Sequence, residues 1–115
     1  MHELSIAHSL VETAVSEALR ANARKVSIVR LRLGVLAGVV RGSLDFCYDL
    51  VARGTLLEGS RLVVEELPVV VFCPRCREEV PLPGIQCFRC PRCDTPCGEV
   101  RQGRELEIES IEIEC

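Results

Sequence analysis

The sequence predicts an α+β protein: a small antiparallel or mixed sheet with two helices, plus an inserted cysteine-rich module. Three observations support this class. Apolar side chains recur at helical spacing in two segments and alternate in three others, and the stretch before the last strand is rich in cysteine and nearly without apolar periodicity. An isolated final strand would be unstable, so we expect it to return to the sheet of the first half. The predicted division is residues 1–68 with 104–115, and an inserted domain of residues 69–103.

The composition is that of a small folded protein. The 115 residues are 48% hydrophobic and 27% charged, which excludes disorder for most of the chain. With 14 Lys+Arg against 17 Asp+Glu the net charge is −3, and this acidic excess argues against nucleic acid as the main partner. No apolar run approaches the roughly 20 residues of a membrane span, and the N-terminus lacks a signal-peptide pattern. We therefore expect a cytoplasmic protein with no membrane partner.

The first three elements follow from the spacing of apolar side chains. Residues 4–22 place them three and four positions apart, on one face of an amphipathic helix. Residues 25–36 alternate apolar and polar side chains, so they predict a strand with one solvent-facing side. A second, shorter helix is expected between Gly42-Ser43, which offers a helix start, and Gly54, a typical C-terminal stop.

The later strands carry two irregularities. Residues 61–72 are rich in β-branched side chains, but Pro68 cannot donate a ladder hydrogen bond, so the strand should bend or leave its sheet there. Residues 104–115 alternate isoleucine and leucine with glutamate, and the alternation changes phase around Ser110. That change predicts a β-bulge in the final strand.

Cysteine usage is the most unusual feature of the chain. Six of eight cysteines fall between residues 73 and 97, whereas the disulfides of a secreted domain usually spread along the sequence. Residues 73–76 and 90–93 are identical Cys-Pro-Arg-Cys tetrapeptides. Two such pairs of thiolates can complete a closed tetrahedral zinc site, which is structural because no position is open to water. We predict a zinc-ribbon-like domain with Cys73, Cys76, Cys90 and Cys93 as ligands.

The spacing leaves other interpretations of this module open. Cys87 lies three positions before Cys90 and Cys97 follows Cys93, so other sets of four ligands are allowed. A redox dithiol would need a helix N-terminus to stabilise the thiolate, and the flanking proline, arginine and glycine supply none. A nucleic-acid-binding ribbon would need more charge, because four arginines against three acidic residues leave a net +1 between residues 73 and 97.

The first three residues, Met1-His2-Glu3, are a second candidate metal site. The terminal amine, the amide nitrogen between residues 1 and 2, and imidazole Nδ1 can close two chelate rings around one ion, and such a planar nitrogen set favours Ni(II) or Cu(II). The fourth position can come from the Glu3 amide or carboxylate. The alternative is a solvated helix entry, with Glu3 at the positive end of the helix dipole. For His8 we expect a surface ion pair with Glu12.

Several motifs are spread along the whole chain. They are the opening Met-His-Glu-Leu-Ser-Ile-Ala, the strand Val-Arg-Leu-Arg-Leu-Gly, Gly54-Thr55 with Glu58-Gly59, the two tetrapeptides, and the closing Gly-Arg-Glu-Leu-Glu-Ile. In this order they resemble the HypA/HybF family, nickel metallochaperones that help mature [NiFe]-hydrogenases. Two cysteines, Cys87 and Cys97, depart from the usual pattern, as does His8, where glutamine is frequent.

The resemblance implies a function and a set of partners. It implies His2 as the essential nickel ligand with Met1 and Glu3 completing the site, and the four tetrapeptide cysteines as structural zinc ligands. It implies a HypB-type nickel-handling GTPase or ATPase and the hydrogenase large subunit as partners. We expect the chain to be a monomer or weak homodimer. No serine–histidine–acid set or phosphate-binding glycine loop suggests an enzyme. The competing function is a zinc-ribbon interaction or nucleic-acid-binding protein.

Overall fold

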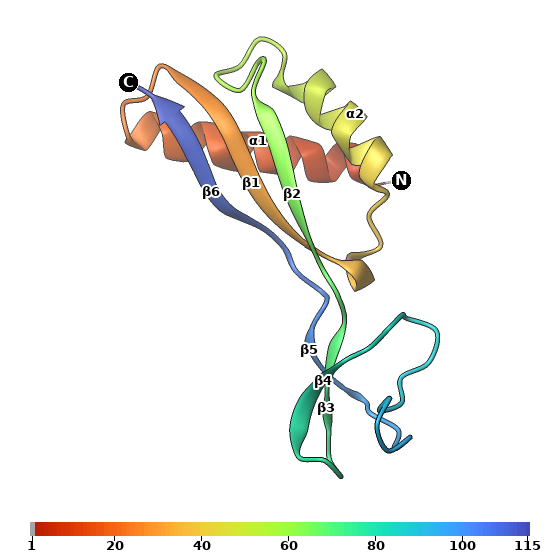
Figure 1. Ribbon diagram of the computed structural model, residues 1–115. Coiled ribbons are helices and arrows are strands. Elements are labelled where there is room, and N and C mark those ends of the chain that lie inside the picture. The colour runs from red at the N-terminus through yellow and green to blue at the C-terminus, as the bar shows by residue number, and fades with distance from the viewer. Residues whose placement is uncertain (1) are drawn as a thin grey trace. The chain divides into compact units, whose positions relative to one another are not determined.

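The computed structural model describes residues 2–115, so Met1 lies outside the described residues. Two α-helices and two three-stranded sheets are present, which confirms the α+β class (Figure 1). The elements in chain order are α1 (Glu3–Arg20), β1 (Lys25–Gly34), the short 3₁₀ helix η1 (Val35–Ala37), α2 (Arg41–Ala52), β2 (Arg61–Leu67), β3 (Val70–Cys73), β4 (Glu78–Pro81), β5 (Glu99–Gln102) and β6 (Leu106–Glu114).

The chain divides into two compact units. The first unit comprises the residues up to Leu31 together with Val39–Val64 and Ile108–Cys115. The second unit comprises Arg32–Gly38 and Glu65–Glu107, so it takes in one end of β1, β2 and β6. The domain limits expected from the sequence, 1–68 with 104–115 and 69–103, remain a prediction.

The final strand returns to the sheet formed by the first half of the chain. The strand order is β2-β1-β6, and the main-chain N–H of Arg24, just before β1, donates to the carbonyl of Glu114 at 2.8 Å. The phase change around Ser110 is also present, because Ile108, Ile111 and Ile113 are half-buried whereas Glu109 and Ser110 are both exposed.

Both helices pack against the same strand, β1, in the first unit. One cluster joins Val11 and Ala14 of α1 to Val26 and Val29 of β1 and to Tyr48 of α2. Tyr48 is only 1% exposed, and burial raises the pKa of its phenol. Its hydroxyl keeps a hydrogen bond inside the core, because it lies 2.7 Å from the Ser60 hydroxyl. A second cluster, of Ala7, Leu10, Leu31 and Leu44, joins the same two helices to β1.

The second helix begins two residues earlier than the Ser43 start expected from the sequence. It begins at Arg41, and its N-cap residue, Val40, has no capping side chain. The Val40 main-chain N–H instead donates to Oε2 of Glu3 at 3.0 Å, so a carboxylate from α1 occupies the positive end of α2. At the other end the helix stops at Ala52, and Gly54 adopts the left-handed φ of 77° expected of a stop.

The second unit contains a small sheet that the sequence did not predict. Its strand order is β4-β3-β5, and Val71 of β3 lies opposite Val80 of β4 and Val100 of β5. Val71 and Val80 are fully buried and pack with the cysteines, so the second unit has a small apolar core despite its lack of apolar periodicity. Part of the core comes from residues before Cys73, after the chain breaks at Pro68 as expected. The composition of the cysteine-rich stretch alone does not include these residues that precede Cys73.

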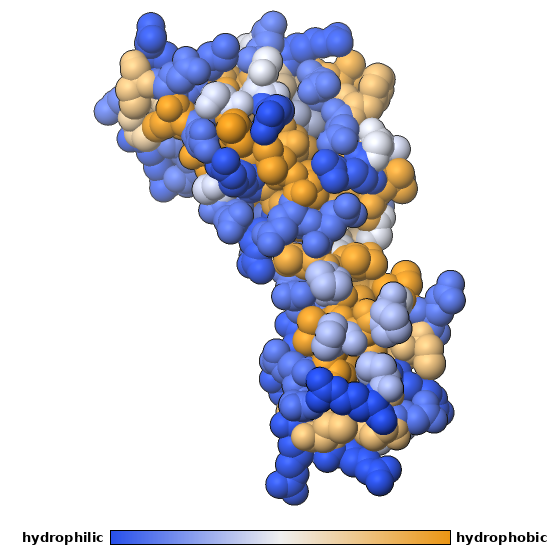
Figure 2. Space-filling view, in the orientation of Figure 1, coloured by the Kyte–Doolittle hydropathy of each residue, from blue (hydrophilic) through white to orange (hydrophobic). Residues whose placement is uncertain are grey.

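Charged side chains form pairs across the strands of the β2-β1-β6 sheet. Arg30 of β1 donates to Glu112 of β6 at 2.6 Å, and Arg32 donates to Glu107 at 2.9 Å. His8 and Glu12 form the expected surface pair, with Nδ1 3.7 Å from the carboxylate. In Figure 2 hydrophilic side chains (blue) cover much of the surface, with hydrophobic ones (orange) between them. No helix among residues 2–115 is long and apolar enough to cross a membrane.

Candidate metal sites

The four tetrapeptide cysteines converge in the second unit. The sulfur atoms of Cys73, Cys76, Cys90 and Cys93 all lie within 4.8 Å of one another. Sγ of Cys73 is 3.5 Å from Sγ of Cys93, and Sγ of Cys76 is 3.6 Å from Cys93 and 3.9 Å from Cys90. A tetrahedral ion with Zn–S bonds of about 2.3 Å would hold its sulfurs about 3.8 Å apart. The sulfur arrangement therefore fits a Zn–S₄ centre.

The two tetrapeptides repeat in structure as well as in sequence. Each is followed by a residue in the left-handed region, Arg77 (φ 57°) and Asp94 (φ 63°). The main-chain N–H of each of these residues donates at 2.8 Å to the carbonyl of the first cysteine of its tetrapeptide, Cys73 or Cys90. Each tight turn also directs a main-chain N–H group toward a sulfur atom. Cys76 N–H lies 3.4 Å from Sγ of Cys73, and Arg92 N–H lies 3.4 Å from Sγ of Cys90.

Hydrogen bonds lower the pKa of two thiols in the cluster. The Thr95 hydroxyl lies 3.1 Å from Sγ of Cys93, and its hydrogen bond to the thiolate lowers the pKa of Cys93 to about 6. The Cys76 main-chain N–H lowers the pKa of Cys73 in the same way. Because four thiols share one site, the Cys76 thiol donates a hydrogen bond to the Cys93 sulfur, and this bond raises the pKa of Cys76 to about 12. A cation at the centre would favour the thiolate form of all four.

The two further cysteines of the module do not join this group. Cys87 is exposed. Cys97 is buried, but its Sγ lies 3.2 Å from the Thr95 carbonyl, and burial raises the pKa of this thiol. The role of Thr95, which contacts Cys93 and Cys97 from one position, was missed by the sequence reasoning. The sequence indicates a role for Thr95 only through its position two residues after the second tetrapeptide.

At the N-terminus, the His2 side chain presents an unpaired nitrogen. Its Nδ1 is inaccessible to solvent and has no hydrogen-bond partner among residues 2–115. Glu3 is 8% exposed, and its hydrogen bond from the Val40 N–H lowers the pKa of its carboxyl group against the opposing effect of burial. Met1 lies outside the described residues. The sequence had no local signal for the contact between Glu3 and Val40, which joins positions 37 residues apart.

The chemistry of the two sites differs. Four clustered sulfurs form a closed donor set that suits zinc and leaves no position for a substrate. The His2 imidazole is a separate candidate ligand, and imidazole suits nickel, copper and zinc. The cysteine group is suited to stabilising a fold.

Comparison with solved structures supports the fold. The solution structure of the Ni metallochaperone HypA from Helicobacter pylori superposes with a TM-score of 0.69 at 20% identity, covering 100% of this chain and 99% of that chain. A second solution structure, of HypA protein, gives a TM-score of 0.72 at 20% identity over 98% of this chain and 96% of that chain. At this identity the likeness concerns the fold alone.

Comparison of sequences identifies the family. The family model described as "Hydrogenase/urease nickel incorporation, metallochaperone, hypA" matches residues 1–113. The hydrogenase maturation factor HypA of Chloroflexus aurantiacus is 53% identical over 97% of this chain and 98% of its own length. The factor of the same name from a Roseiflexus species is 49% identical over 99% and 93%. The chain therefore belongs to the HypA family of nickel-incorporation metallochaperones, a family of carriers and not of enzymes.

Proposed function

We propose that this chain binds Ni(II) at its N-terminus and delivers it for maturation of a [NiFe]-hydrogenase, while a separate zinc ion stabilises the second unit. The single observation that carries the nickel site is Nδ1 of His2, which is buried and without a hydrogen-bond partner among the described residues. Burying a polar nitrogen unpaired costs free energy, and binding a cation would remove that cost. Membership of the HypA family supports nickel as the cargo.

In this proposal the nickel ligands are Met1, His2 and Glu3. The Met1 amine, the following amide nitrogen and Nδ1 of His2 form a planar set of three nitrogens, and Glu3 supplies the fourth position through its amide or its carboxylate. The hydrogen bond from Val40 to the Glu3 carboxylate ties the start of α1 to the start of α2. The ligands therefore begin from a fixed position in the first unit.

The proposed zinc ligands are Cys73, Cys76, Cys90 and Cys93. Three of their sulfur–sulfur distances are 3.5–3.9 Å and all four sulfurs lie within 4.8 Å of one another, which supports a tetrahedral ion, and Thr95 would hold Cys93 as its thiolate. A zinc ion bound there would cross-link the two tetrapeptides and would be structural rather than catalytic. The second unit would then be stabilised both by the ion and by the small apolar cluster around Val71 and Val80.

Delivery requires partners and a cellular location. We propose that nickel passes between this chain, a HypB-type GTPase or ATPase and the hydrogenase large subunit, in the cytoplasm, with the chain a monomer or weak homodimer. A site at the chain start suits transfer, because an acceptor can approach it without unfolding the carrier. Nucleic acid is a poorer partner, since Arg92 is paired with Glu78 and Arg101 with Glu79 and Glu99.

The test is a nickel titration of untagged, zinc-loaded protein beside His2→Ala, with the zinc content of both measured. We expect the native chain to bind about one nickel ion, and the variant to lose nickel but keep its zinc, because the two donor sets share no residue. His8→Ala is the matched control, since His8 is exposed and pairs with Glu12. If all three proteins bind nickel equally, or none binds it, the N-terminus is only a helix entry and a zinc-ribbon interaction protein is the better account.

A further inference from the structure

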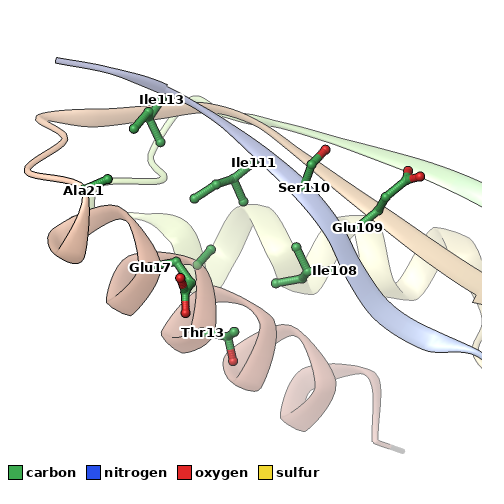
Figure 3. Close-up of a pocket in the computed structure, with 9 residues that line it drawn as sticks. Thr13, Glu17, Ala21, Ile108, Glu109, Ser110, Ile111 and Ile113 are labelled. Atoms are coloured by element: carbon green, nitrogen blue, oxygen red, sulfur yellow. The ribbon is translucent and has the colours of Figure 1, made fainter.

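A groove lies between α1 and β6 in the first unit, away from the residues that we propose to bind nickel. Its volume is about 490 Å³. Figure 3 shows the residues that line it, with Thr13, Glu17 and Ala21 on the helix side and Ile108, Ile111 and Ile113 on the strand side. The three isoleucines are only half-buried, and the helix residues opposite them are mostly short, so the groove has an apolar floor that remains open to solvent.

The strand beside this groove has a free edge. Among residues 2–115, β6 has a strand neighbour on one side only, because the sheet order is β2-β1-β6. The main-chain groups along the other edge of such a strand are available to pair with a further strand. Addition of an extended segment to an exposed sheet edge is a common mode of peptide recognition, in which pockets beside the edge select alternate side chains.

The side chains of β6 point to the two faces of the sheet, and the side chains of an added strand would alternate between the same two faces. Figure 3 shows Ile108 and Ile111 pointing toward α1, whereas Glu109 and Ser110 point away from it. Side chains of neighbouring strands alternate together between the two faces of a sheet. A strand added to β6 would therefore place one set of side chains against the apolar floor and the other set beside Glu109.

The charges on the strands of the sheet indicate which side chains an added strand should place beside Glu109. Arg30 of β1 pairs with Glu112 of β6, and farther along the same strands Arg32 pairs with Glu65 of β2 and with Glu107. The sign of charge thus alternates from strand to strand, and β6 is acidic. Glu109 has no ion-pair partner among the described residues. Opposite charges on adjacent strands are favourable and like charges are not, so the complementary neighbour of β6 is basic.

We propose that β6 and the groove beside it bind an extended segment of a partner protein, which adds to the sheet as a fourth strand. Its apolar side chains face Ile108 and Ile111, and its lysine or arginine side chains lie beside Glu109. A second copy of this chain is a poor occupant, because two glutamate-rich β6 strands would repel each other. The inference does not depend on nickel binding, since the groove includes none of residues 1–3.

The experiment uses the full-length, zinc-loaded and nickel-free chain labelled with ¹⁵N. The probe is a synthetic nine-residue peptide of alternating lysine and valine, added while amide chemical shifts are followed by NMR. We expect saturable shifts concentrated in residues 108–113 and the facing side of α1. Binding should weaken with added salt, because paired charges at the surface are screened. A peptide methylated on alternate main-chain nitrogens should fail to bind, since it cannot complete the strand pairing.

Two charge reversals locate the site. Glu109→Lys should weaken peptide binding roughly fivefold or more, because one cross-strand attraction becomes a repulsion. Glu12→Lys is the matched control: it makes the same charge change at an exposed position of α1 outside this groove and should leave binding unchanged. The proposal is overturned if the peptide does not bind, if the methylated peptide binds equally well, if both reversals have the same effect, or if the chain alone dimerises through β6.

Discussion

At Gly34 two main-chain segments of the second unit approach each other closely. A Cβ atom added there would lie 2.1 Å from the carbonyl carbon and oxygen of Gly103. Two main-chain hydrogen bonds join the same segments. Gly34 N–H donates to the carbonyl of Glu105, and Leu36 N–H donates to the carbonyl of Gly103, both at 2.7 Å. The lack of a side chain at Gly34 therefore leaves space for the main chain at Gly103.

We expect Gly34→Ala to lower the free energy of unfolding by roughly 1–3 kcal/mol, because the backbone must move to relieve the overlap. Urea unfolding of the zinc-loaded chain measures this loss. Gly42→Ala is the control, since no atom lies within 4 Å of its added Cβ and alanine is favoured over glycine in a helix, so this variant should be as stable as the native chain or more so. Equal effects of the two substitutions would contradict the steric explanation.

Glu3 acts at the same scale by capping a helix other than its own. Because Val40 N–H donates to it, the pKa of Glu3 in the folded chain is below its ordinary value of 4.5. The charged carboxylate therefore stabilises the fold above about pH 4.5, and this contribution is lost as the pH falls through the lower folded pKa. We expect Glu3→Ala to lower the thermal midpoint of the helical signal at neutral pH, and Ser43→Ala to change it little.

The comparison of Glu3→Ala and Ser43→Ala distinguishes the cap seen in the structure from the local cap expected from the sequence. The difference in midpoint between the native chain and Glu3→Gln should stay constant down to about pH 4.5 and shrink as the pH falls further through the folded pKa of Glu3, because both chains then carry an uncharged group. A larger loss for Ser43→Ala than for Glu3→Ala would show that the cap of α2 is local.

At the scale of elements, the glutamates of β6 act as one side of a charged ladder. The pair between Arg30 and Glu112 is short, 2.6 Å, but the two side chains are 39% and 50% exposed. Exposed pairs contribute little to stability. We therefore expect Glu112→Gln to change the free energy of unfolding by less than about 1 kcal/mol and to leave nickel binding unchanged, as measured by urea unfolding and nickel titration. Loss of nickel binding would show that this face has a metal role.

At the scale of the molecule, the two units differ in how they are stabilised. The first unit has two apolar clusters that contain none of the four grouped cysteines, whereas the cluster of the second unit contains all four. A structural zinc ion contributes on the order of 10 kcal/mol to a small domain. We expect a zinc chelator to abolish amide-exchange protection in residues 65–107 and to leave α1 and α2 protected. Equal loss of protection in both units would contradict this expectation.

Acidification should separate the two proposed metal sites. Protons compete with nickel for amine and imidazole nitrogens as the pH falls, because both must be deprotonated to bind the ion. In the other site a zinc ion would favour the thiolate form of all four cysteines. We therefore expect nickel to be released at higher pH than zinc in a pH titration with metal analysis. Simultaneous or reversed release would contradict the two donor sets.

Much of the fold could be predicted because its signals are local. Apolar spacing identified both helices and the strands of the first unit, and Pro68 identified the break between β2 and β3. The tetrapeptide repeat identified the four cysteines that converge, because a gap of two residues brings both thiols of one turn to the same point. The small sheet of the second unit was missed, since strands of four residues are too short to show a period.

The sequence by itself determined the class of the protein, its secondary structure in outline and the four cysteines that converge, because periodicity and the spacing of cysteines depend on neighbours a few positions apart. Only the tertiary structure decided which group caps α2, which sulfurs accept hydrogen bonds from Thr95 and main-chain amides, and that β6 is a free edge beside an apolar groove. Each of these features joins an element to a partner outside it, and such contacts have no period in the chain. They arise when packing of the apolar faces brings distant segments together.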